Sequence, residues 1–491
     1  MSTPIETSDT IAAISTPVGQ GAIGIVRITG PTAFGLAEKV FALRGAGVEN
    51  RVERYLYYGS VHSCDGVKID DGFIVYMSGP NSYTGEDTVE LFCHGGLLVT
   101  ARVLETVLAA GARIAEPGEF TRRAFMNGKL DLAQAEAVID VIKASTDGAL
   151  RSARARLGGT LSKRINSIKD GLVDLRVRIE ATLDFPEDIS PELLEKGRSK
   201  EETDPLVAEL ATVVADAEGA LQRLLATYDE GRLLREGLRV LILGRPNVGK
   251  SSLLNLLLQE ERAIVTHLPG TTRDLIEEPL NIRSIPVRLI DTAGLRETAD
   301  LVESIGIEAA RAQIESADMV LFVVDLTDSD FTEDRKIVES IEADKILIVA
   351  NKKDSADIEA HARLEKTFSD MGRVAVSALG FSNDTANNEK DGSGIVELEE
   401  ALFTLATGHA PGSAQGADQT SEMITSVRHK RSLEGALVAL ERARAAAVGR
   451  VPLELVATDL LLATNSLGEV TGAVTTDDIL SKIFSEFCIG K

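Results

Sequence analysis

The sequence predicts a multidomain protein in which an α+β domain precedes a helical domain, and an α/β domain is inserted into the helical one. Three observations lead to this prediction. Runs with a period of two dominate residues 11–94, and a helical period of 3.6 takes over near residue 130 and returns near residue 421. Between the helical parts, a fully apolar strand enters a glycine-rich turn at residues 238–251. With 491 residues the chain is long enough for several cores.

The first domain is expected at residues 1–127 and has an α+β composition. Residues 97–110 predict a helix, because their apolar side chains recur at helical spacing. β-rich runs predict strands at residues 11–16, 22–29, 72–77 and 88–94.

The helical domain is expected in two parts, at residues 128–236 and 412–491. Asp131 is placed to cap a helix with Gln134 at the third position, the pattern of a capping box. Apolar residues then recur at helical spacing, which predicts the core of a helix bundle. In between, residues 237–411 alternate strands with helices, as in a parallel sheet covered by helices. Inserting one domain into another in this way is suited to coupling a ligand state to helix movement.

The charge balance restricts the partners. Acidic residues outnumber basic ones 76 to 52, so the net charge is −24. Because phosphate-backbone binding depends on Lys and Arg, contacts to an RNA would have to come from a local patch or a basic partner. The sequence has no signal peptide and no apolar run of about 18 residues, so we expect a cytoplasmic protein with no membrane contact. For Cys64 and Cys93 we expect half-buried thiols without metal-site spacing.

The turn after the strand at residue 238 has the pattern of a phosphate-binding loop. The segment Gly-Arg-Pro-Asn-Val-Gly-Lys-Ser occupies residues 244–251 and opens a helical stretch. In such loops the backbone N–H groups and the helix N-terminus surround the phosphates. Lys250 is then expected to reach the β- and γ-phosphate oxygens, and the hydroxyl of Ser251 to coordinate Mg²⁺.

A second motif, Asp-Thr-Ala-Gly at residues 291–294, ends another apolar strand. Asp291 suits the outer shell of the metal, and the N–H of Gly294 suits the γ-phosphate. Thr272, between the two motifs, is the expected second Mg²⁺ hydroxyl. Leu295 stands where small signalling GTPases carry a water-orienting Gln, so another group must orient the water.

A third motif, Asn-Lys-Lys-Asp at residues 351–354, predicts recognition of guanine. The carboxylate of Asp354 can accept hydrogen bonds from guanine N1–H and the 2-amino group together. Adenine offers neither donor, and the unpaired carboxylate would then cost roughly 1–3 kcal/mol. After Ser377 at the end of the next strand, Ala378 can offer its backbone N–H to guanine O6. The three motifs, in this order, predict a GTPase.

With these residues in hand, the chain resembles the tRNA-modification GTPases of the TrmE/MnmE family over nearly its full length. As a set, the matching motifs are specific. They are Gly-Ala-Ile-Gly-Ile-Val-Arg-Ile at 21–28, Gly-Pro-Asn-Ser-Tyr-Thr-Gly-Glu-Asp at 79–87, Pro-Gly-Glu-Phe at 117–120, Lys-Leu-Asp-Leu-Ala-Gln-Ala-Glu at 129–136 and Phe-Cys-Ile-Gly-Lys at 487–491.

The resemblance implies that the protein works with a FAD-containing partner to add an aminomethyl or carboxymethylaminomethyl group to C5 of the wobble uridine of certain tRNAs. A 5-formyl- or methylene-tetrahydrofolate would supply the carbon unit. The N-terminal domain would bind this folate and form a homodimer, which joins the partner in a heterotetramer that binds tRNA mainly through the partner. By motif position, the resemblance implies folate contacts for Arg27, Glu90, Lys129 and Lys491, and it places Cys488 at the same site.

The resemblance also implies GTP hydrolysis through dimerised G domains, helped by K⁺. Asn247, Thr266, Leu268 and Thr271 match the K⁺ ligands, and Glu303 matches the residue that orients the water. Lys250, Thr272, Glu303 and Cys488 are the catalytic candidates. The residues expected to contact GTP or GDP are Asn247, Val248, Gly249, Lys250, Ser251, Ser252, Thr266, Thr271, Thr272, Asp291, Gly294, Asn351, Lys352, Asp354, Ser377 and Ala378.

Two other functions compete with this one. A ribosome-assembly or regulatory GTPase would share the same nucleotide motifs but append an RNA-binding module, whereas the flanks here are helical and acidic. A stand-alone folate-dependent methyltransferase regulated by GTP would transfer the carbon unit without any partner.

Overall fold

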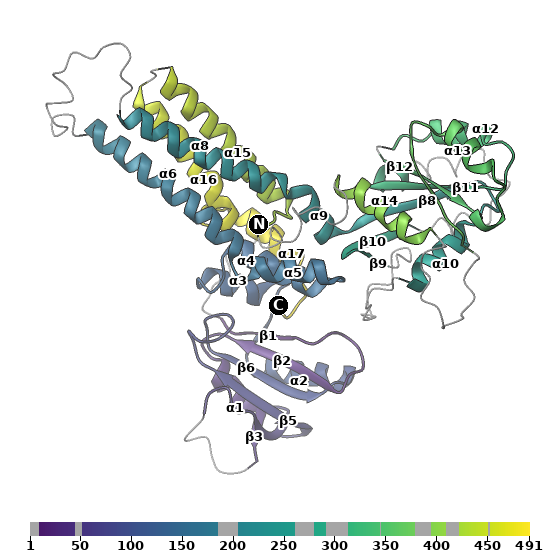
Figure 1. Cartoon of the computed structure of the whole chain (residues 1–491). Coiled ribbons are helices and arrows are strands. Elements are labelled where there is room, and N and C mark those ends of the chain that lie inside the picture. Colours follow the sequence, from purple (N-terminus) through teal and green to yellow (C-terminus); the bar gives the residue numbers. More distant parts are fainter. Residues whose placement is uncertain are drawn as a thin grey trace, which may run out of the picture.

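The computed structural model describes residues 9–44, 52–184, 205–260, 279–290, 313–343, 345–378, 394–408, 422–449 and 452–491. Figure 1 shows an N-terminal β-rich lobe, a long helical bundle and a second α/β lobe. Within these ranges no helix is both long and apolar enough to cross a membrane. The multidomain architecture is confirmed, whereas the domain limits at residues 127, 236 and 411 stay predictions.

The N-terminal lobe is a mixed seven-stranded sheet with the order β3-β4-β5-β6-β2-β1-β7. All neighbours are antiparallel except β1 and β7. Two helices, α1 (Ala33–Val40) and α2 (Leu97–Ala109), pack their apolar faces on the sheet to form its core. The strands are β1 (Ile11–Ile14), β2 (Ile23–Thr29), β3 (Phe41–Leu43), β4 (Tyr57–His62), β5 (Lys68–Met77), β6 (Thr88–His94) and β7 (Arg113–Ile114).

The predicted strands and helix of this lobe are confirmed to within a few residues, but β3, β4, β7 and α1 were not predicted. The expectation for two of the cysteines was wrong. Cys64 is exposed and Cys93 is buried in the core of the sheet, so neither thiol is half-buried.

The helical part joins distant segments in one core. Apolar side chains from residues 161–228 and 424–470 pack together in the bundle of α6, α8, α15 and α16. The capping box is confirmed: Asp131 Oδ1 accepts from the Gln134 N–H at 2.9 Å, and Gln134 Oε1 accepts from the Asp131 N–H at 3.0 Å. The helices are α3 (Glu119–Met126), α4 (Leu132–Lys143), α5 (Asp147–Leu157), α6 (Thr160–Asp184), α8 (Pro205–Ala226), α9 (Tyr228–Glu236), α15 (Val427–Val448), α16 (Leu453–Thr471) and α17 (Asp477–Ser485).

The α/β lobe has a six-stranded sheet with the order β13-β12-β11-β8-β10-β9. It is parallel as predicted, except that β9 pairs antiparallel with β10. Helices cover both faces, with one apolar core on each. The elements are β8 (Leu238–Gly244), β9 (Pro279–Ile282), β10 (Ile285–Ile290), β11 (Met319–Asp325), β12 (Ile346–Asn351) and β13 (Gly372–Ala375), with α10 (Lys250–Glu260), α12 (Thr332–Glu339), η3 (Lys353–Ser355), α13 (Ala360–Thr367) and α14 (Ile395–Thr407).

Contacts at two places, among others, tie the lobes to the helical part. The turn between β9 and β10 packs on the start of α5, where the Thr146 hydroxyl donates to the Ser284 carbonyl at 2.7 Å. At the other end, the C-terminal residues after α17 lie against β1, and the Ser15 hydroxyl donates to the Gly490 carbonyl at 3.2 Å. The last residues of the chain thereby reach the first lobe.

Candidate functional site

The phosphate-binding loop lies between the end of β8 and the start of α10. Gly244 has a φ of +146°, and a Cβ there would lie 2.3 Å from the Val323 carbonyl oxygen. Gly249 has a φ of +94°, and its Cβ would lie 2.1 Å from Asn351 Nδ2. Because both the dihedral and the space exclude a side chain, only glycine fits at these two positions. The loop therefore leaves its backbone bare, as a phosphate cradle requires.

Lys250 begins α10 and its side chain folds over the loop. Its ammonium group donates to the carbonyls of Gly244 at 2.8 Å and Arg245 at 2.6 Å. Ser251 follows in the first turn of the helix, and Asn247 is exposed in the loop with a φ of 65°. The cationic group, the hydroxyl and the amide are thus gathered around the same bare backbone.

The second residue of the loop is anchored from outside. The Arg245 guanidinium lies 3.3 Å from the carboxylate of Asp334 and 3.4 Å from that of Asp328. Burial raises the pKa of the Asp334 carboxyl, although the charge of Arg245 acts in the opposite direction. Sequence reasoning missed this anchor, because an acidic residue in a short polar helix is usually solvent-exposed.

Asn351, which is 2% exposed, connects the phosphate-binding loop to the Ser377-Ala378 loop, which is expected to contact guanine. Its Nδ2 donates to the Val248 carbonyl at 2.9 Å, and its Oδ1 accepts from the Ala378 N–H at 3.1 Å. One side chain therefore holds the phosphate-binding loop and the Ser377-Ala378 loop at a fixed separation.

Asp354 presents the carboxylate that is expected to bind guanine. It is exposed, and it accepts hydrogen bonds from Ser377 Oγ at 2.5 Å and Ser355 Oγ at 2.8 Å. These bonds, the one from Ser377 first, lower the pKa of Asp354 and keep it ionised. Behind it, Lys352 has a φ of 64° and forms an ion pair with Asp325 at the end of β11. Asp325 was also missed, although an acidic residue closing an apolar strand is a usable signal.

Several predicted residues lie outside the described ranges. They are Thr266, Leu268, Thr271 and Thr272 before β9, and Asp291, Gly294 and Glu303 after β10. Of the residues predicted to bind Mg²⁺ or K⁺, the structure therefore describes only Ser251 and Asn247. Among the described residues, no group of three or more His, Cys, Asp and Glu is placed to hold a metal ion.

A second cluster forms in the N-terminal lobe around Arg27 and Glu90. The two residues are direct partners on β2 and β6, and both Nε and Nη2 of Arg27 lie 2.8 Å from Glu90 Oε1. The guanidinium also lies 5.6 Å from the ring centres of Tyr83 and Phe120. An ion pair beside two aromatic faces is suited to a planar ligand with polar groups.

The C-terminal residues join this cluster. Gly490 has a φ of +96°, and a Cβ there would lie 2.3 Å from the Ile14 carbonyl oxygen. Burial, followed by the charge of Arg27, lowers the pKa of the Lys491 ammonium, while Glu90 and Cys488 act in the opposite direction. The structure thus brings Arg27, Glu90, Cys488 and Lys491 within electrostatic reach of one another.

Lys129, the remaining predicted folate contact, holds the loop at residues 79–87. Its ammonium group donates to the Pro80 carbonyl at 2.9 Å. The same loop carries Glu86, which meets the buried Arg123 at 3.1 Å. Lys129 is therefore connected to the cluster through the loop that also supplies Tyr83.

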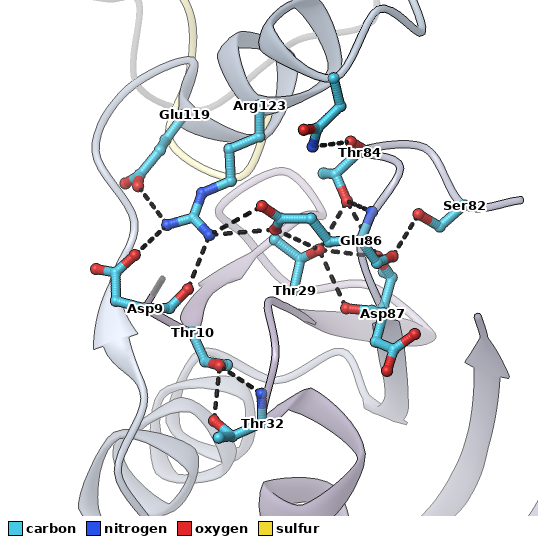
Figure 2. A network of polar contacts seen from close by, with 12 residues as sticks. Asp9, Thr10, Thr29, Thr32, Ser82, Thr84, Glu86, Asp87, Glu119 and Arg123 are labelled. Carbon is cyan, nitrogen blue, oxygen red and sulfur yellow. Dashed lines mark hydrogen bonds and ion pairs between the residues drawn. The ribbon is translucent and has the colours of Figure 1, made fainter. Parts of the chain in front are cut away.

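Figure 2 shows how Arg123 contacts this loop through Glu86. The residue is 1% exposed and donates to the Asp9 carbonyl at 2.8 Å and to Glu119 Oε1 at 3.0 Å, besides its contact with Glu86. Burial opposes ionisation of Glu119, but hydrogen bonds led by that from Arg113 lower the pKa of its carboxyl. This network ties the segment before β1, helix α3 and the 79–87 loop together.

Comparison with known proteins agrees with this architecture. The family described as "MnmE helical domain" matches residues 132–488, and "GTP-binding protein TrmE N-terminus" matches residues 10–129. A protein of Geobacter sulfurreducens named "tRNA modification GTPase MnmE" is 45% identical, covering 98% of this chain and 99% of its own length. Proteins of the same name from Moorella thermoacetica and Carboxydothermus hydrogenoformans are 44% and 42% identical, with the same coverage. The predicted resemblance is confirmed, and the chain belongs to the TrmE/MnmE family.

Proposed function

We propose that this chain is a guanine-specific GTPase that acts in tRNA modification, as the names of its relatives indicate for those proteins. The observation that supports guanine-specific GTP binding is the position of Asn351. Its side chain joins the phosphate-binding loop to the Ser377-Ala378 loop, and the ionised Asp354 accepts a hydrogen bond from Ser377 of that second loop. A nucleotide lying between them would have its phosphates at the loop and its guanine at the carboxylate.

For hydrolysis, the residues of the loop would orient the phosphates. The bare backbone at Gly249 and the ammonium group of Lys250 would bind the β- and γ-phosphate oxygens. Ser251, with Thr272, would hold Mg²⁺, which neutralises charge on the phosphates. Asn247, together with Thr266, Leu268 and Thr271, would hold K⁺ and so add positive charge where other GTPases use an arginine.

Orientation of the attacking water would fall to Glu303. Leu295 has no hydrogen-bonding side chain, so the usual position cannot serve. Because Glu303 lies outside the described residues, this assignment rests on the motif match alone.

The N-terminal lobe would bind a tetrahydrofolate. In support, the ion pair of Arg27 and Glu90 adjoins two aromatic rings, and the chain end brings Cys488 and Lys491 to it. Lys129 would contribute through the 79–87 loop. We further propose a homodimer that joins a FAD-dependent partner, with the modified position at C5 of the wobble uridine. The net charge of −24 favours a partner that supplies most tRNA contacts.

The test is the modified-uridine profile of tRNA, measured by mass spectrometry in a strain that lacks this protein. The strain is complemented with the wild type, with Asp354→Asn or with Cys488→Ser. We expect a C5-aminomethyl-type uridine to disappear and only the wild type to restore it fully. An unchanged profile in the deletion strain would rule out the proposed role in tRNA modification. Normal ribosome assembly in that strain would exclude the competing assembly function.

A further inference from the structure

A cleft of about 830 Å³ lies where the helical part, β10 and the C-terminal helix α17 meet. Its walls come from α4, α5, the end of α9, β10, the start of α15, the end of α16 and α17. In Figure 1 the labels of α4, α5 and α17 stand together at the centre of the molecule. The cleft contains none of the residues assigned above to GTP or folate, and its volume is that of a small-molecule site.

The inner wall of the cleft is an ionic network whose charges are paired. Asp140 accepts from Arg156 at 2.6 Å and from Arg235 at 2.9 Å. Glu136 similarly pairs with Arg428 at 2.9 Å. Because these charges satisfy one another, they give the wall a fixed shape and contribute little net charge.

Three more cations line the cleft. Lys143 lies at the end of α4, Arg431 on α15 and Lys482 on α17, and all three are exposed. None of their cationic side-chain groups has a hydrogen-bonding or ionic partner within the part of the chain that the structure describes. The lining also carries the carboxylates of Glu236, Glu469 and Glu486. Its seven Lys and Arg nevertheless outnumber its five Asp and Glu, in contrast to the strongly acidic chain as a whole. This excess of cations attracts an oxyanion.

Two buried donors on the wall give an independent indication. Ser152 is 1% exposed, and its hydroxyl has no hydrogen-bond partner among the described residues. The Nε of Arg156 is likewise without a partner there. Buried polar atoms are nearly always hydrogen-bonded, so donors left over on the wall of a cleft point to an acceptor that binds in it.

We propose that this cleft binds a small multivalent oxyanion, either a phosphorylated or a polycarboxylate metabolite. Lys143, Arg431 and Lys482 would pair with its charges, and the Ser152 hydroxyl would donate to it. Arg288 of β10 lines the same cleft, so the ligand would contact the α/β lobe and the helical part together. A ligand that contacts both parts would favour their docked arrangement. One of these contacts is on β10, which ends at Ile290 directly before the Asp-Thr-Ala-Gly motif.

Isothermal titration calorimetry on the full-length protein tests the proposal. A non-hydrolysable GTP analogue and Mg²⁺ are bound first, so that the phosphate-binding loop is filled. Inorganic phosphate and citrate are then titrated separately, which distinguishes a phosphate site from a carboxylate site. We expect one of them to bind saturably, and the triple variant Lys143→Gln, Arg431→Gln, Lys482→Gln to bind it about tenfold more weakly or worse.

The matched control is the triple variant Arg154→Gln, Lys163→Gln, Lys366→Gln. It makes the same charge change at exposed positions outside the cleft, and we expect unaltered binding. Ser152→Ala should weaken binding a few-fold, and thermal melting checks that each variant is folded. Equal binding by the cleft variant and the wild type, or no binding of either anion at millimolar concentration, overturns the proposal. Binding of tRNA alone, weakened by the cleft variant, would overturn it in favour of an RNA contact.

Discussion

The nucleotide site and the N-terminal cluster differ in how far along the chain their parts are separated. In the α/β lobe the functional groups follow the ends of β8 and β12 and the segment after β13, where a parallel sheet brings successive loops to one edge. In the N-terminal lobe, Arg27 and Glu90 sit on adjacent strands, but Lys491 arrives only after the whole helical part. The first site depends on one sheet, and the second depends on how the lobes dock.

This difference predicts that the nucleotide site fails through local changes and the N-terminal cluster through remote ones. The largest local effect is expected for Gly249→Ala. The new Cβ would lie 2.1 Å from Asn351 Nδ2 at a φ of +94°. Both the phosphate-binding loop and Asn351, which connects it to the Ser377-Ala378 loop, must therefore shift. We expect GTP affinity to fall on the order of 10³-fold, because backbone strain and the clash add.

Equilibrium binding of a fluorescent GTP analogue measures this loss. The control is Gly171→Ala, in the middle of α6, where a Cβ meets nothing within 4 Å. That change should leave binding intact and stabilise the helix by up to about 1 kcal/mol. Wild-type affinity in Gly249→Ala would show that the loop does not need a bare backbone there.

The N-terminal lobe is expected to lose most stability in Arg123→Met. The variant leaves Glu86 without its cation, while Asp9 and Glu119 keep only Arg113, at a cost of roughly 3–5 kcal/mol. Denaturant unfolding of the full chain, followed through tyrosines of this lobe, measures the change. The neighbour Arg122 is partly exposed, so Arg122→Met should change stability by less than about 0.5 kcal/mol. Equal effects of the two variants would contradict a structural role for the network.

A smaller effect is expected for base recognition in Asp354→Asn. The amide oxygen could still accept from guanine N1–H, but the amide NH₂ would then face the 2-amino group, donor against donor, so GDP should bind about 100-fold more weakly. Xanthosine diphosphate, which has a carbonyl in place of the 2-amino group, should bind better to the variant than to the wild type. Asp357→Asn is the control, because Asp357 is exposed and pairs with Arg363. If both variants discriminate as the wild type does, Asp354 does not contact the base.

The smallest effect we expect is a loss of stability of the N-terminal lobe at low pH. Burial opposes ionisation of Asp9 and Glu119, but hydrogen bonds from Arg113 and Arg123 lower the pKa of both carboxyls. Their contribution to stability is therefore complete above the ordinary pKa values of 3.8 and 4.5, and it is lost as the pH falls through the lowered native values. Thermal melting of the N-terminal lobe should show this loss below about pH 4.5. In Arg123→Met the acid dependence should weaken, and an unaltered profile would argue against the network as its cause.

Much of the fold follows from local patterns. The strand predicted at residues 88–94 and the capping box at Asp131 appear as predicted, because each depends on neighbours in sequence. The strand before the Asp-Thr-Ala-Gly motif was predicted and is β10, but β9 and the turn that pairs it with β10 were missed. That turn uses Arg283 and Ser284 at positive φ rather than the usual glycine. Strand β4 was missed because its alternation is broken by polar and glycine residues.

The site residues, too, could be predicted only where they belong to a local sequence pattern. The glycines and Asn351 could be identified because the chemistry of phosphate and guanine fixes residue types at short spacing. Arg123 could not, because an arginine in a short helix is usually exposed and only the tertiary structure surrounds it with three carboxylates. The convergence of Lys491 on Arg27 came from the family resemblance alone, since no local pattern connects residues so far apart.

The central claim is that the nucleotide site depends on one sheet, whereas the N-terminal cluster depends on docking of the chain end. Its most direct test is Gly490→Ala, assayed for GTP hydrolysis and for tRNA modification. A Cβ at residue 490 would meet the Ile14 carbonyl at 2.3 Å, so the chain end could not settle against β1. We predict that the purified variant hydrolyses GTP within about twofold of the wild type, because the nucleotide site is remote, while the modified uridine is lost from tRNA in complemented cells. Gly35→Ala, where a Cβ meets nothing within 4 Å, should preserve both. Full modification in Gly490→Ala would contradict the account, and so would a parallel fall in GTP hydrolysis.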